Sequence, residues 1–152
     1  MRKTILTFIL VISIYPLFAQ KYTETYIKDA NKVALDWLND IKQEQYKNAY
    51  TLLSEEVKLK FQQENWIGLM NNLMLEFGEL KSRKVTKTYF QSEIENIEDG
   101  FYVFIYYDVN YKNTKEHTEM LLLKQNDKTA WEIFDYNYEF KEKEEISPPK
   151  SE

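Results

Sequence analysis

The apolar residues of this chain change their spacing near Gly78. Before this residue they recur every three or four positions, a pattern that predicts helices with one apolar face. After it they recur every second position, which predicts strands with one buried face. Helices followed by strands are typical of α+β domains. We therefore predict an α+β fold, with N-terminal helices packed on a curved four-stranded antiparallel sheet.

The first half predicts helices over residues 25–44, 46–53 and 63–77. Ser54 is expected to cap a further helical turn, because its side chain can accept a backbone N–H. Gly68 lies inside the last of these helices and costs about 1 kcal/mol relative to alanine. Gly78 follows that helix, and a left-handed C-cap is expected there.

The second half predicts strands over residues 80–93, 101–112, 118–125 and 130–140. Short polar turns separate them, at residues 99–100, 112–116 and 126–128, so an antiparallel meander is expected.

The second strand has two different faces. One is wholly apolar or aromatic and is expected to meet the helices: Phe101, Val103, Ile105, Tyr107, Val109 and Tyr111. The other is aromatic at one end and polar at the other: Tyr102, Phe104, Tyr106, Asp108 and Asn110. A face of this second kind is often covered by a partner or a loop.

Residues 1–19 have the three parts of a secretory signal peptide: a basic start, a short apolar centre and a small residue, Ala19, at the exit. An uncleaved anchor is the alternative, but this stretch is shorter than the ~20 apolar residues of a spanning helix. Without a cysteine, a lipoprotein is not expected. The sequence predicts a periplasmic or extracellular protein with no membrane span after cleavage.

The segment after the signal peptide suits a single domain over residues 25–140. The charged tail over residues 141–152, with its two prolines, is expected to be disordered. Removing Arg2 and Lys3 leaves 18 basic against 25 acidic residues. An acidic chain without a basic patch is a poor binder of nucleic acid, so we predict no nucleic-acid partner.

Several short stretches resemble one family when they are taken in order: residues 34–38, 45–50, 65–66, 77–83 and 131–136. Together they are similar to the DUF4019 family of exported bacterial proteins, in the NTF2-like (cystatin-like) superfamily. The resemblance covers residues 30–138 and departs from the family at the turn over residues 126–129, where a glycine is common. It implies an NTF2-like roll and an exported address, and it implies no reaction.

Proteins with that roll often hold a pocket between sheet and helices, and some place an Asp base with Tyr donors in it. The resemblance therefore makes Asp108 and Asp135 weak candidates for a catalytic base. The alternative is that the tyrosines pack with ordinary partners while both acids lie in water. Because a fold supplies no reaction by itself, a non-catalytic role is favoured.

His117 is the only histidine and lies between acidic residues in a segment expected to be a polar loop. One histidine without cysteine is a poor start for a zinc site or a nucleophilic triad. We predict that His117 is exposed, and we expect no metal and no cofactor.

Arg83 follows the helix-to-sheet corner and has two possible roles. It can pair with Asp135 or Glu132 and fix the corner, or it can hold an anion in the pocket. The structural role is favoured, because a buried Arg needs a partner. Three tryptophans and a methionine-containing stripe are expected in the helix–sheet interface: Trp37, Trp66, Trp131, Met70, Leu73 and Met74.

Three functions are compatible with the sequence. The first is a non-catalytic module that binds a small apolar or amphipathic ligand, or a protein, with these candidate residues: Tyr102, Phe104, Tyr106, Arg83, Tyr136 and Tyr138. The second is a small lyase or isomerase. The third is self-association alone, with the sheet face forming a homodimer interface.

Overall fold

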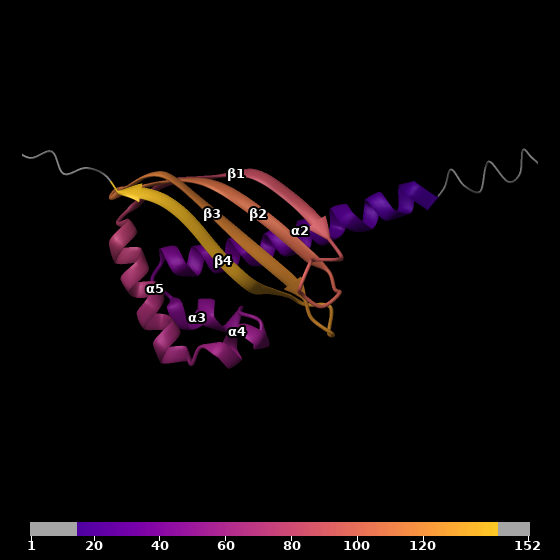
Figure 1. Cartoon of the computed structure of the whole chain (residues 1–152), viewed down its shortest axis with the longest axis horizontal. Helices are drawn as coiled ribbons and strands as arrows, with labels where there is room; N and C mark the ends of the chain where they lie inside the picture. The colour runs from indigo at the N-terminus through magenta and orange to yellow at the C-terminus, as the bar shows by residue number, and fades with distance from the viewer. Residues whose placement is uncertain (1–14, 143–152) are drawn as a thin grey trace, which may run out of the picture.

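The computed structural model describes residues 15–142, with the side chains from Tyr22 onward. Four helices come first and four strands follow, which confirms the α+β class (Figure 1). The helices are α2 (Tyr15–Lys42), α3 (Tyr46–Thr51), α4 (Glu55–Lys60) and α5 (Gln63–Phe77). The strands are β1 (Leu80–Gln91), β2 (Tyr102–Tyr111), β3 (Thr114–Gln125) and β4 (Trp131–Glu142).

Helix α2 begins at Tyr15, ten residues before the predicted start at Thr25. The predicted signal peptide lies outside the described residues up to residue 14, and the predicted tail does so from residue 143. Within residues 15–142, no helix is long and apolar enough to cross a membrane.

The sheet is an antiparallel meander in the order β1-β2-β3-β4. All four helices lie on one side of it, with α2 running along the sheet and α3, α4 and α5 beyond its β4 edge (Figure 1). The loop before α4 covers part of that edge. The N–H of Ser54 donates to the carbonyl of Ile133 over 2.8 Å, and the N–H of Ile133 donates to the carbonyl of Leu52 over 2.8 Å.

The core lies between α2, α5 and the helix-facing side of the sheet. Val103 and Ile105 are fully buried there, as the two-residue repeat of the second strand predicts. Trp37, Trp66 and Trp131 are buried in the same core, which confirms their predicted place. Ser54 accepts a hydrogen bond from the N–H of Val57, so the predicted cap of α4 is present.

The expectation that His117 is exposed in a loop is wrong. The strand β3 begins at Thr114 rather than Thr118, and its pairing register shifts between Lys115 and Thr118. Glu116 takes a positive φ of 51° in this irregularity. Against β2 the register is unbroken, so alternation along β3 places His117 on the same helix-facing side as Glu119 and opposite Val109, where only 3% of the residue is exposed.

Gly78 ends α5 with φ 75° and ψ −161°. The positive φ is as predicted, but the extended ψ places this residue in a region that only glycine adopts readily, rather than in the left-handed helical region. A Cβ at this position would come within 2.7 Å of the Asn113 side chain. That side chain donates to the carbonyl of Glu76 over 3.0 Å and so caps the end of α5.

Two glycine-to-alanine substitutions should therefore have opposite effects. Gly78→Ala should lower the free energy of unfolding by about 1–3 kcal/mol, because it adds backbone strain. Gly68→Ala should raise it by about 0.5–1 kcal/mol, since a Cβ there meets nothing within 4 Å. Urea denaturation of both variants measures the two changes. Equal effects of the same sign would contradict this account of Gly78.

Candidate functional site

A buried carboxylate is the centre of the helix-facing side of the sheet. The side chain of Glu119 is fully buried and pairs with Arg83. Arg83 donates from Nε to Oε2 over 2.7 Å and from Nη2 to Oε1 over 3.0 Å. The hydroxyls of Tyr111 and Tyr136 donate to Oε1 over 2.8 and 2.9 Å. We call these four residues the Arg83–Glu119 cluster.

Strand register explains why residues so far apart in the sequence meet. Glu119 lies opposite Tyr107 of β2 on one side and opposite Tyr138 of β4 on the other. Arg83 lies opposite Val109, two residues along β2 from Tyr107 and on the same face. The strands β1, β2 and β4 therefore each place a donor beside Glu119 of β3, on the side of the sheet that faces the helices.

The carboxylate of Glu119 accepts four hydrogen bonds. Three of them go to Oε1, from Arg83, Tyr111 and Tyr136, and one goes to Oε2, from Nε of Arg83. These hydrogen bonds and the Arg83 charge stabilise the ionised carboxylate.

The protonation states of the cluster follow from its burial. Burial and the charge of Glu119 raise the pKa of Tyr136 well above its ordinary value. Burial alone would lower the pKa of Arg83, but the hydrogen bonds and charge of Glu119 more than offset this effect and raise it. Tyr136 is therefore neutral and Arg83 charged at neutral pH, as their hydrogen bonds require.

The expected pairing of Arg83 with Asp135 or Glu132 is wrong, because the partner is Glu119. The side chain of Asp135 is exposed, and Glu132 accepts a hydrogen bond from Asn126 within the last turn. Neither acid lies beside Arg83, since a register shift between Leu122 and Leu123 displaces the first residues of β4.

Breaking this cluster should destabilise the fold strongly. Glu119→Gln leaves the Arg83 charge without a counter-ion and should lower the free energy of unfolding by about 3–5 kcal/mol. The double variant with Arg83→Met should lose much less than the sum of the two single losses, because both charges are gone. Urea denaturation measures the cycle, with the exposed pair partner Glu116→Gln as the control that changes little. An unchanged stability of the single variant Glu119→Gln would exclude a structural role for the pair of Glu119 with Arg83.

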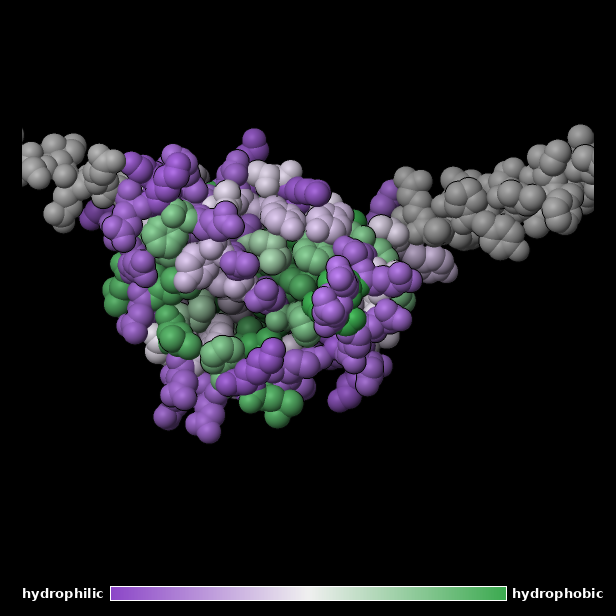
Figure 2. All heavy atoms as spheres, in the orientation of Figure 1, coloured by the Kyte–Doolittle hydropathy of each residue, from purple (hydrophilic) through white to green (hydrophobic). Residues whose placement is uncertain are grey.

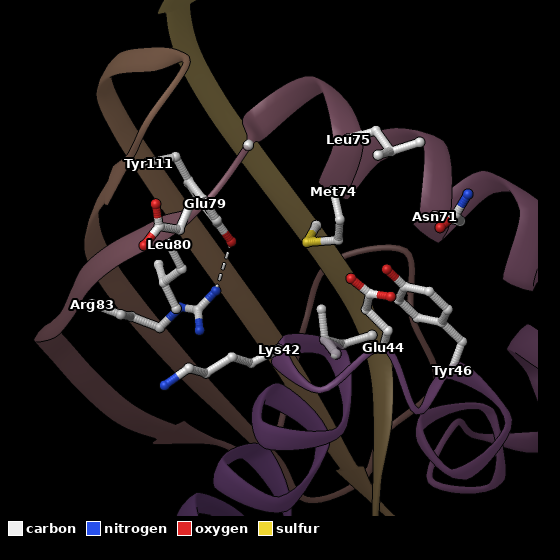
Figure 3. A pocket seen from close by; sticks show the side chains of 12 residues that line it. Lys42, Glu44, Tyr46, Asn71, Met74, Leu75, Glu79, Leu80, Arg83 and Tyr111 are labelled. Carbon is white, nitrogen blue, oxygen red and sulfur yellow. Dashed lines mark hydrogen bonds between the residues drawn. The ribbon is translucent and has the colours of Figure 1, made fainter.

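A polar hollow of about 600 Å³ opens beside the cluster, between the end of α2, α5 and the start of β1. We call it the Arg83 pocket. Arg83 and Tyr111 form part of its wall, joined by a hydrogen bond from Nη2 to the Tyr111 hydroxyl over 2.9 Å (Figure 3). The other polar lining residues are Lys42, Glu44, Tyr46, Asn71 and Glu79, and the apolar ones include Ile41, Met74 and Leu80.

A second, mainly apolar hollow of about 530 Å³ lies between β4 and helices α4 and α5. We call it the helix–sheet groove. Green apolar side chains gather in this part of the molecular surface, and purple hydrophilic ones surround them (Figure 2). Its apolar lining includes Trp37, Trp66, Phe61, Leu69, Met70, Leu73 and Phe134, with Tyr136 and Tyr138 from β4.

The aromatic face predicted for ligand binding lies on the opposite side of the sheet from the helices. Tyr102 is fully buried there and donates its hydroxyl to the carbonyl of Glu98 over 2.8 Å. Phe104 and Tyr106 are half-buried. They stack with Tyr89, with ring centroids 4.8 and 6.2 Å from it. The sheet face is therefore partly covered by the chain itself.

Asp108 and Asp135 do not lie in an enclosed site. Both side chains are exposed, Asp108 on the outer face of the sheet and Asp135 beside the helix–sheet groove. Glu119 is the enclosed carboxylate. Glu119 was not predicted as a site residue, because the strand that contains it was expected to begin only at Thr118, one residue before it.

Among residues 15–142, no three acidic, histidine or cysteine side chains gather as metal ligands.

His117 lies in an aromatic enclosure beside the cluster. Its ring packs edge-on against Phe77 at 4.4 Å and stacks on Phe140 at 5.3 Å. Nδ1 is 2.8 Å from the Thr114 hydroxyl, and Nε2 is 4.0 Å from Oε1 of Glu119. Burial lowers the pKa of His117, Glu119 opposes this effect, and Arg83 adds to it.

Stability should consequently fall in mild acid. A lowered pKa in the native state means that the unfolded chain takes up a proton at a higher pH than the native chain does. The free energy of unfolding should therefore decline as the pH falls below the ordinary histidine value of about 6.5. His117→Gln should flatten this decline between pH 7.5 and 5.5 in urea denaturation, since the sequence holds no other histidine. Identical slopes for the two proteins would show that His117 does not titrate with unfolding.

A family model described as "Protein of unknown function (DUF4019)" matches residues 33–136, which include the C-terminal part of α2, the Arg83–Glu119 cluster and the residues that line both hollows except Tyr138. A search of curated proteins finds no match.

Proposed function

Because the chain belongs to the DUF4019 family, whose description gives no activity, we propose its function from the geometry alone. It is a non-catalytic binding module that holds a small amphipathic ligand in the helix–sheet groove. We further propose that residues 1–19 are a signal peptide, on the basic start and short apolar centre of this segment, and that the protein acts in the periplasm or outside the cell. The observation that carries the proposal is an apolar groove of about 530 Å³ whose wall leaves large hydrophobic side chains in water.

The exposed apolar wall supports an apolar ligand. Leu69 is 55% exposed, although it lines the groove. Phe61 and Tyr138 are also exposed and lie in the same lining. Removing such surface from water contributes about 25 cal/mol per Å², part of which is lost to the cost of immobilising the ligand.

Polar groups of the groove can interact with the polar part of an amphipathic ligand. Lys60, Glu76 and Asp135 lie among the lining residues, so a ligand head group of either sign finds a charged neighbour. The indole N–H of Trp37 is buried without a partner in the described part of the chain. A buried unsatisfied donor costs about 1–3 kcal/mol, which an acceptor on the ligand would offset.

The floor of the groove is held in place before any ligand binds. Tyr136 donates its hydroxyl to Glu119, and its ring lies 5.2 Å from that of Trp37. A wall with little freedom loses little conformational entropy on binding. The outer sheet face is a weaker candidate, since Tyr102 is buried there and the other rings stack on one another.

The test uses probes that share one tail and differ in charge: decanoate, decylamine and decyl maltoside, each below its micelle concentration. Binding is followed by tryptophan fluorescence and calorimetry, because Trp37 and Trp66 line the groove. Saturable one-to-one binding of at least one probe is expected. Leu69→Glu should weaken that binding by about tenfold or more, since it places a charge in the apolar wall.

Leu59→Glu is the matched control, because Leu59 is 86% exposed and does not line the groove. It should change the affinity less than twofold. Equal losses in the two variants, or no saturable binding of any probe, would remove the proposal. Sedimentation at several protein concentrations separates ligand binding from the self-association alternative.

A further inference from the structure

We propose that the Arg83 pocket is a second binding site, which takes a short peptide with free termini. The site is independent of the helix–sheet groove and of the function proposed for it. The proposal rests on two cations, Arg83 and Lys42, on one side of a hollow of about 600 Å³ and on the carboxylate of Glu44 on the other side.

The carboxylate end of the ligand is matched by Arg83. Its Nε and Nη2 are both engaged with Glu119, and Nη2 also donates to Tyr111. No hydrogen bond involves Nη1 in the described part of the chain, although Arg83 lines the pocket. The cluster therefore fixes the guanidinium and leaves one nitrogen, with two N–H groups, for an acceptor in the pocket.

Lys42 adds a second positive charge on the same side. It is the last residue of α2, and its amino group lies on the Arg83 side of the pocket in Figure 3. Lys42 is exposed and makes no ion pair within residues 15–142. A carboxylate placed between Lys42 and Nη1 of Arg83 would interact with two cations.

The opposite wall is acidic. Glu44 lies across the pocket from Arg83, beside Tyr46 and with Met74 between the two sides (Figure 3). Burial and, to a smaller extent, the nearby charge of Glu44 raise the pKa of Tyr46. The carboxylate of Glu44 has no ion pair in the described part of the chain, so it is free to receive an ammonium group.

Size and charge together select the class of ligand. Ligand pockets are commonly about 300–1,000 Å³, so this hollow is large enough for a peptide of a few residues. Ile41, Met74 and Leu80 offer apolar surface to its side chains. Glu79 lies on the Arg83 side in Figure 3 and is paired with Lys81, whereas the exposed carboxylate of Glu44 on the other wall disfavours a multiply charged anion such as phosphate.

Trialanine is the first probe, and calorimetry is the measurement. Saturable binding of free trialanine to the full exported chain is expected, and inorganic phosphate should not compete. Amidation of the C-terminus should weaken binding by about tenfold or more, because the acceptor for Arg83 and Lys42 loses its charge. Acetylation of the N-terminus should weaken it to a smaller extent, since Glu44 is exposed.

Two exposed residues give variants that should fold normally. Lys42→Gln should weaken the free peptide but affect the amidated peptide much less. Glu44→Gln should weaken the free peptide but affect the acetylated peptide much less. Lys47→Gln and Glu64→Gln are the matched controls, because these residues are exposed and lie outside the pocket lining. Leu69→Glu should leave peptide binding unchanged, which separates this site from the groove.

The proposal is overturned if free trialanine shows no saturable binding. It is overturned equally if blocked and free peptides bind alike, or if the control variants lose as much affinity as Lys42→Gln and Glu44→Gln do. Competition by phosphate at a similar concentration would instead assign the pocket to simple anions and would also refute it.

Discussion

The fold depends on satisfying the buried carboxylate of Glu119 with hydrogen bonds and a counter-ion. An ionised carboxylate without partners in the interior would carry a very large desolvation penalty. Here it is balanced by Arg83, which comes from β1, and by two hydroxyls, which come from β2 and β4. Because the donors are on three other elements, the pair is satisfied only when all four strands have their native register. The cluster therefore favours the native strand order and register over other pairings. The apolar core supplies most of the stabilisation.

The same cluster shapes both hollows of the molecule. Tyr136 belongs to the wall of the helix–sheet groove, whereas Arg83 and Tyr111 belong to the wall of the polar pocket. All three are held by hydrogen bonds that involve Glu119. Side chains fixed in this way lose little freedom when a ligand arrives. The carboxylate of Glu119 thus fixes Tyr136 in the wall of the groove and Arg83 in the wall of the pocket. In the pocket, Nη1 of Arg83 keeps two N–H donors for a ligand.

Sequence spacing predicted most of the fold, because both periods arise from the backbone geometry of helices and strands. Val103 and Ile105 lie in the core, and Ser54 caps α4, as the pattern indicates. Spacing failed at a strand boundary and at register shifts. The strand β3 begins at Thr114 rather than Thr118, and alternation continued back from Leu121 and Glu119 would have placed His117 on the buried face. The partner of Arg83 was missed because pairing across several strands depends on every register shift between them.

The candidate sites show a further limit of the same argument. Alternation correctly groups Tyr102, Phe104 and Tyr106 on the face away from the helices, but it does not say which segment covers that face. In the structure, Tyr102 is covered by the loop between β1 and β2, which Lys124 holds through an ion pair with Glu98. Lys124 also pairs with Glu56 of α4, so the covering depends on contacts between distant parts of the chain. The loop between β1 and β2 covers Tyr102 on the outer face of the sheet. The helix–sheet groove and the Arg83 pocket are not filled by the chain in this way, so they offer more room for a ligand than the outer face does.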